Sequence, residues 1–130
     1  MDLFSFKRLV LVAGAALTLI IFLRSAGTLA ALADVASLVF LGWCLLPLGH
    51  LWIFGRDDDP AMTRLILAAA AAMVVVFGTW VYVDMTVISL DPQNSLAFVI
   101  VPLMQMAVVV PAILAAWIVR RRNPQPVAAG

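Results

Sequence analysis

Four long apolar runs decide what this chain can fold into, because each approaches the ~20 residues that a helix needs to cross a bilayer. The runs extend over Leu9–Leu23, Val35–Phe54, Leu65–Val83 and Leu96–Val119. Hydrophobic residues make up 65% of the chain and charged residues 12%, against roughly 45 to 50% and about 25% in soluble domains. A soluble domain of 130 residues cannot bury that much apolar surface. We therefore expect the surplus to face lipid.

The connections between the runs are short, which favours antiparallel neighbours. The sequence thus predicts an all-α integral membrane protein with four transmembrane helices in an up-down antiparallel bundle. We expect one domain over residues 1–122 and a flexible cytoplasmic tail over 123–130. The predicted spans cover about residues 6–24, 33–54, 64–84 and 95–119.

The first span is the weakest, because Lys7 and Arg8 interrupt its start and must turn their side chains outward. The start of the chain also resembles a secretory signal with a cleavage site. The features it shares with one are the two cations, the apolar run and Ala31–Ala33. Arg24 lies between the apolar run and that site, which argues against cleavage.

The basic residues predict the orientation, because Lys and Arg are retained on the cytoplasmic side during insertion. Seven of the eight fall on one side of a four-span arrangement, and Arg24 alone falls on the other. The seven are Lys7, Arg8, Arg56, Arg64, Arg120, Arg121 and Arg122. We therefore expect both termini in the cytoplasm, with the protein in a bacterial inner (plasma) membrane.

Small residues predict where the helices touch, since membrane helices associate through close backbone packing. One such face consists of Ala13 to Ala16, with Gly14, together with Thr18, and another runs from Ala68 to Ala72. We expect both faces to line interfaces, within the chain or between copies. Aromatic side chains near the span ends are typical of interfacial belts, and they are Trp52, Trp80, Tyr82 and Trp117.

The only Cys and the only His, Cys44 and His50, flank Pro47 in the second run. Six residues of helical rise separate the two ligands by roughly 9 Å, too far to bind one ion on a regular helix. Near the span end, His50 is better explained as an interfacial side chain. Pro47 has no amide hydrogen and frees the Trp43 carbonyl, so we expect a kink there, accommodated by packing or serving gating.

Gln105 is the only strongly polar side chain near the middle of a span, and it follows Pro102 by one turn. Its amide could satisfy a carbonyl freed by the proline or form a hydrogen bond with another helix. The functional alternative is an amide that orients a ligand in a central cavity.

The remaining candidates are charges at the span ends. Arg24, Asp34 and Asp84 could pair across one mouth of the bundle or gather cations, with a solvated rim as the simpler interpretation. Asp57–Asp59, flanked by Arg56 and Arg64, is likewise better explained as a solvated charge run than as a divalent-ion site.

Several classes of function lack support in the residues. The chain has no Glu, and its second, third and fourth spans carry no charged residue deep within them, whereas coupled transport usually needs such a residue. No Ser-His-Asp or Cys-His arrangement suggests an enzyme, no basic and aromatic pattern suggests nucleic acid, and we expect no cofactor.

Three hypotheses of function remain. The first is a non-enzymatic accessory or structural protein of the lipid bilayer, which packs as a homo-oligomer or within a larger membrane complex. The second is an oligomeric channel or carrier for a small solute or ion, built around Gln105. The third is a metal- or haem-binding protein that uses His50.

Overall fold

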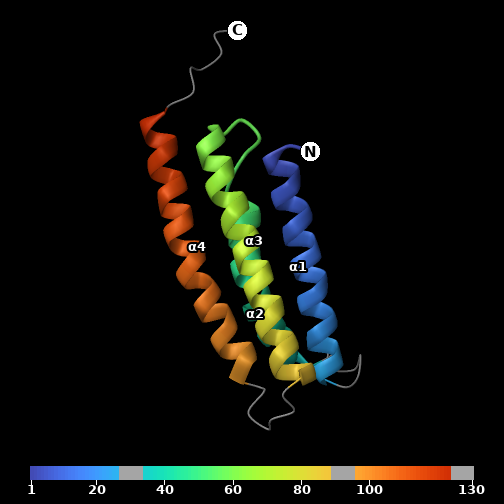
Figure 1. Cartoon of the computed structure of the whole chain (residues 1–130). Coiled ribbons are helices and arrows are strands. Elements are labelled where there is room, and N and C mark those ends of the chain that lie inside the picture. Colours follow the sequence, from blue (N-terminus) through green and yellow to red (C-terminus); the bar gives the residue numbers. More distant parts are fainter. Residues whose placement is uncertain (27–33, 89–95, 124–130) are drawn as a thin grey trace.

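The computed structural model describes residues 1–26, 34–88 and 96–123. This part of the chain contains four long α-helices, one π-helical turn and no strand. The elements are α1 (Leu3–Ala26), α2 (Val35–Ile53), α3 (Ala61–Val83), η2 (Asp84–Ile88) and α4 (Ala97–Arg122). Figure 1 labels the four long helices. Each long helix has the length and apolar composition needed to cross a membrane. The prediction of an all-α protein with four candidate spans is confirmed.

Side chains that cap the helices explain two of the observed boundaries. The Asp2 carboxylate accepts a hydrogen bond from the Ser5 amide at 2.7 Å, so α1 begins before the predicted residue 6. That bond also lowers the pKa of the Asp2 carboxyl below its usual 3.8. Asp34 caps α2 by accepting from the Ser37 amide at 3.1 Å. Four predicted features lie outside the described residues. They are the span starts at residues 33 and 95, the possible cleavage site, and the tail after Asn123.

The four helices form a ring in which α1 and α4 are each flanked by α2 and α3. Helices α3 and α4 pack most extensively, followed by α1 with α3. Helices α2 and α3 follow one another in sequence but make far fewer contacts, and Figure 1 shows α2 behind α3. The expectation that consecutive helices are close neighbours therefore holds for α1–α2 and α3–α4, while the α2–α3 connection crosses the bundle.

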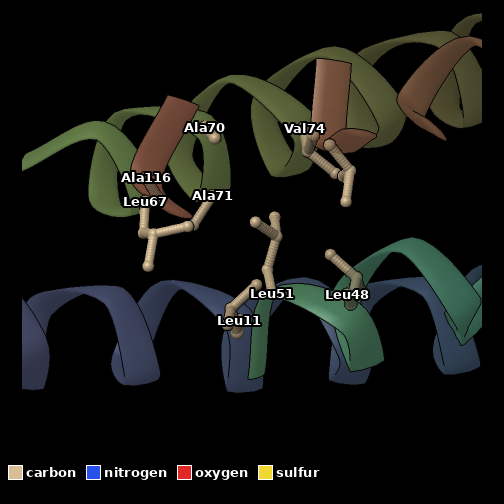
Figure 2. Packing of buried hydrophobic residues seen from close by; sticks show 9 residues of the cluster. Leu11, Leu48, Leu51, Leu67, Ala70, Ala71, Val74 and Ala116 are labelled. Atoms are coloured by element: carbon tan, nitrogen blue, oxygen red, sulfur yellow. The ribbon is translucent and has the colours of Figure 1, made fainter. Parts of the chain in front are cut away.

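The main core matches large side chains against small ones. Leucines of α1 and α2 face alanines and a valine of α3 in Figure 2, with Leu51 opposite Leu67 and Ala71. Small residues on α3 let its backbone approach its neighbours closely, which provides the packing that membrane helices depend on. The cluster consists of Leu11, Leu48, Leu51, Leu67, Ala70, Ala71, Val74, Val109 and Ala116.

A second, aromatic cluster fills the other half of the bundle. Tyr82 stacks on Phe98 with ring centroids 5.1 Å apart, and Phe22 meets Phe98 edge-on at 5.9 Å. Tyr82 is 1% exposed, so its predicted place in an interfacial belt is wrong. Its ring finds an aromatic partner across the helix interface, whereas Trp80 on the same helix is exposed.

The predicted small-residue faces do line interfaces within the chain, with one shift. Gly14 is buried against Val75, where an added Cβ would lie 2.5 Å from a Val75 methyl group. Thr18 is buried one turn later, but Ala13 and Ala16 are exposed. The contact face of α1 therefore runs through Gly14 and Thr18, because residues four apart share one side of a helix.

Candidate functional site

Gln105 joins α4 to α3 in the interior of the bundle. Its side chain is 4% exposed, and Nε2 donates a hydrogen bond to the Val74 carbonyl at 3.0 Å. The amide lies over Gly78, where an added Cβ would overlap Nε2. Of the structural roles considered for Gln105, the contact with another helix is the one observed.

The carbonyl freed by Pro102 has a different partner. Proline has no amide hydrogen, so the Phe98 carbonyl loses its usual helical donor. The Cys44 thiol of α2 is 3.5 Å from that oxygen and donates to it. Next to it, Trp43 Nε1 donates to the Val99 carbonyl at 3.4 Å. Two consecutive side chains of α2 thus bond to two consecutive carbonyls of α4.

The role of Cys44 was missed from the sequence, which gave it no function beyond a place in the apolar interior. The signal that could have indicated it is the freed carbonyl itself, since a buried acceptor must find a donor. Few side chains within the spans can donate, and a thiol is one of them.

Pro47 and His50 do not join Cys44 in a site. Pro47 is buried in α2, and His50 is half-buried, with Nδ1 2.8 Å from the Leu46 carbonyl of its own helix. Because a carbonyl can only accept, Nδ1 is the nitrogen that donates in this contact. Within the described ranges, no three His, Cys, Asp or Glu residues gather as metal ligands.

The charges predicted at one mouth of the bundle do not pair with one another in the described part of the chain. Asp34 is engaged as the cap of α2, with bonds to the amide and hydroxyl of Ser37. Asp84 is half-buried where α3 changes into η2, and Arg24 is exposed in the last turn of α1. Ion pairs in the described part of the chain form instead at the opposite end of the bundle. They join Arg56 to Asp58 and Arg120 to Asp59.

At that end, Lys7 is buried, which corrects the expectation that it points outward. It is 2% exposed, and Nζ donates to the Phe54 carbonyl at 2.7 Å. This carbonyl lies at the end of α2, where helical carbonyls lack helical donors. Gly55 turns the chain there with φ +95°, and a Cβ on it would come within 2.9 Å of Nζ.

Asp59 is also buried, so the interpretation of Asp57–Asp59 as a wholly solvated run is wrong. Its Oδ2 accepts from Arg120 at 2.6 Å and from the Arg56 amide at 2.6 Å. Asp57 and Asp58 remain exposed. Together with Lys7, this carboxylate connects the start of α1, the α2–α3 connection and the end of α4. We refer to Lys7, Phe54, Asp59 and Arg120 as the end clamp.

The crevices in the described part of the chain include two that each lie between a pair of helices. The larger, about 320 Å³, is formed by α1 and α2 and is lined by apolar side chains and Gly49. The other, about 190 Å³, is formed by α3 and α4 and includes Gln105. We refer to it as the Gln105 crevice, and its walls are Met73, Val74, Phe77, Met104, Gln105 and Val108.

Comparisons of the chain with protein-family models, curated proteins and solved structures found no match.

Proposed function

We propose that the chain is a non-enzymatic accessory or structural protein of a bacterial inner membrane, which acts by helix packing with itself or a partner complex. The observation that carries this proposal is the use that the chain makes of the polar side chains between its helices. Cys44, Trp43 and Gln105 each donate to the backbone of a neighbouring helix. These hydrogen bonds connect the helices to one another, and the three side chains do not gather at one reactive site.

We propose further that the helices cross the membrane as an up-down bundle with both termini in the cytoplasm. The end clamp supports this orientation, because it places Lys7 and Arg120 at one end of the bundle, where the Arg56 amide also bonds to Asp59. A basic end is the one retained in the cytoplasm. A reporter enzyme that is active only in the periplasm should be active when fused after residue 92 and inactive when fused after residue 58. The reverse pattern contradicts the orientation.

The outer face of α2 is where we expect a copy or partner to pack. This helix is the least buried of the four candidate spans. Gly42 and Gly49 lie one heptad apart on it, and an added Cβ at either position meets nothing within 4 Å. Glycine in a helix costs about 1 kcal/mol relative to alanine, yet lets a second backbone approach closely in a membrane. The other exposed residues of this face are Val35, Leu38, Val39, Leu46 and Ile53.

A photo-crosslinking residue placed at Leu46 tests this proposal in native membranes. Val76, which is exposed on α3, provides the matched control. We expect Leu46 to give a defined adduct, at dimer mass for self-packing or with one partner chain, and Val76 to give none. The Gly42→Leu, Gly49→Leu double variant should abolish the adduct. Lipid adducts alone, or equal adducts at both positions, contradict the proposal.

The second candidate function, an oligomeric carrier or channel, is favoured only by the position of Gln105 on a crevice. Flux into proteoliposomes that disappears in Gln105→Leu supports this role. Unchanged flux removes Gln105 from it.

A further inference from the structure

The Gln105 amide has a hydrogen-bonded nitrogen and an oxygen without a hydrogen-bond partner in the described part of the chain. Nε2 must face the Val74 carbonyl, because a carbonyl oxygen cannot donate, and this fixes the orientation of the amide. Oε1 then points the other way, where no donor among the described residues reaches it. A buried acceptor without a partner is unfavourable and in native proteins has an explanation.

The Gln105 crevice provides apolar space beside this amide. Its volume is about 190 Å³, and an apolar cavity of about 150 Å³ is enough to bind benzene. Its walls are otherwise methionine, phenylalanine and valine side chains. Less than 1 Å² of Oε1 is exposed, so a ligand has to displace a wall residue. Met73 and Met104, both more than half exposed, are flexible enough to move aside.

We propose that this crevice binds a small apolar molecule with a single hydroxyl group, such as a lipid-soluble phenol or alcohol. The hydroxyl donates to Gln105 Oε1, and the ring or branched chain packs against Phe77 and Val108. Access is lateral from the bilayer, because Met73 and Met104 lie on the outer surface of α3 and α4.

The walls argue against two other occupants. A metal cation needs several oxygen ligands, and the side chains here offer one oxygen. A water molecule needs two to four polar partners, which this apolar crevice does not supply. A molecule with one donor and an apolar body matches both features of the site. The inference goes beyond the accessory role and does not depend on it.

The probes that test this inference are 4-fluorophenol and 4-fluorotoluene, which differ by the hydroxyl group. Their binding to the full chain in lipid nanodiscs is followed by ¹⁹F NMR, and each probe is compared between variants so that lipid partitioning cancels. A hydrogen bond inside a membrane contributes about 0.6 to 1.7 kcal/mol, or roughly 3- to 18-fold in affinity. We expect Gln105→Leu to weaken 4-fluorophenol binding by that factor and to leave 4-fluorotoluene unchanged.

A second pair of variants keeps the test valid if Gln105→Leu fails to fold. Val108→Phe fills the crevice from α4 and leaves the amide intact, whereas Val110→Phe makes the same change at an exposed position of α4. Val108→Phe should abolish saturable binding of both probes, and Val110→Phe should not. The proposal is overturned by the absence of saturable 4-fluorophenol binding to the unaltered protein. Equal loss of both probes in a folded Gln105→Leu variant, or no loss in Val108→Phe, also overturns it.

Discussion

Replacing Asp59 measures how much the end clamp contributes to stability. One oxygen, Oδ2, accepts both the Arg120 guanidinium and the Arg56 amide, each at 2.6 Å. The Asp59 side chain is 4% exposed and that of Arg120 is 39% exposed. Asp59→Ala removes both bonds, while Asp59→Asn keeps one oxygen that can accept them, replaces the other oxygen with an NH2 group and removes the charge.

The burial of the two partners sets the expected magnitude. Removing one member of a fully buried ion pair costs about 3 to 5 kcal/mol, whereas a surface pair contributes about 0 to 1 kcal/mol. Arg120 can turn to solvent once its partner is lost, which reduces the penalty. We therefore expect Asp59→Ala to lower the free energy of unfolding by about 2 to 3 kcal/mol and Asp59→Asn by about 1 kcal/mol.

Asp58 provides the matched control next to it in the sequence. Its pair with Arg56 spans 3.8 Å, and the two side chains are 75% and 78% exposed. Asp58→Asn should change stability by less than about 0.5 kcal/mol. Reversible unfolding in mixed micelles, followed by far-UV circular dichroism, measures all three variants. Equal effects of Asp58→Asn and Asp59→Asn would refute the reasoning from burial.

Three further changes test contacts elsewhere in the bundle. Gly78→Ala should destabilise it by about 1 to 3 kcal/mol, because the new methyl group overlaps the Gln105 amide; the same unfolding assay measures this. Cys44→Ala should cost about 0.5 to 1.5 kcal/mol by leaving the Phe98 carbonyl without its thiol donor, and Cys44→Ser, which keeps a donor, should lie closer to the unaltered protein. The hydrogen bond from the Ser5 amide lowers the pKa of the Asp2 carboxyl below 3.8. The ionised Asp2 therefore stabilises α1 above pH 3.8, and this stabilisation is lost as the pH falls through the lowered pKa of the folded protein. Amide hydrogen exchange in the first turn of α1 should accelerate as the pH falls below that pKa, after correction for the intrinsic pH dependence of exchange. Asp2→Asn should remove the effect.

The sequence was sufficient to predict the helices because length and apolar composition determine which segments can cross a bilayer. Four apolar runs predicted four helices, and Gln105 was correctly expected to reach a neighbouring helix as one alternative. Exact ends were less predictable, because caps such as Asp2 and Asp34 depend on a local hydrogen bond that hydropathy does not report.

The pairing of side chains could not be predicted, since it depends on which helices are neighbours. Lys7 and Asp59 looked like solvated charges because both lie next to polar sequence. They are buried because the α2–α3 connection crosses the bundle, which places the Phe54 carbonyl next to Lys7 of α1 and Asp59 next to Arg120 of α4. Tyr82 was misplaced for the same reason, since its partner Phe98 comes from another helix.

The central claim, that the chain acts through packing on the outer face of α2, is tested most directly by Gly42→Leu combined with Gly49→Leu. Both positions are open, and leucine forms helices better than glycine by up to about 1 kcal/mol per site, so the single chain should be at least as stable as before. We predict that the assembly measured by native mass spectrometry from lipid nanodiscs disappears while the unfolding free energy does not fall. An unaltered chain that is monomeric and captures no partner, or an assembly that persists in the double variant, would contradict the account.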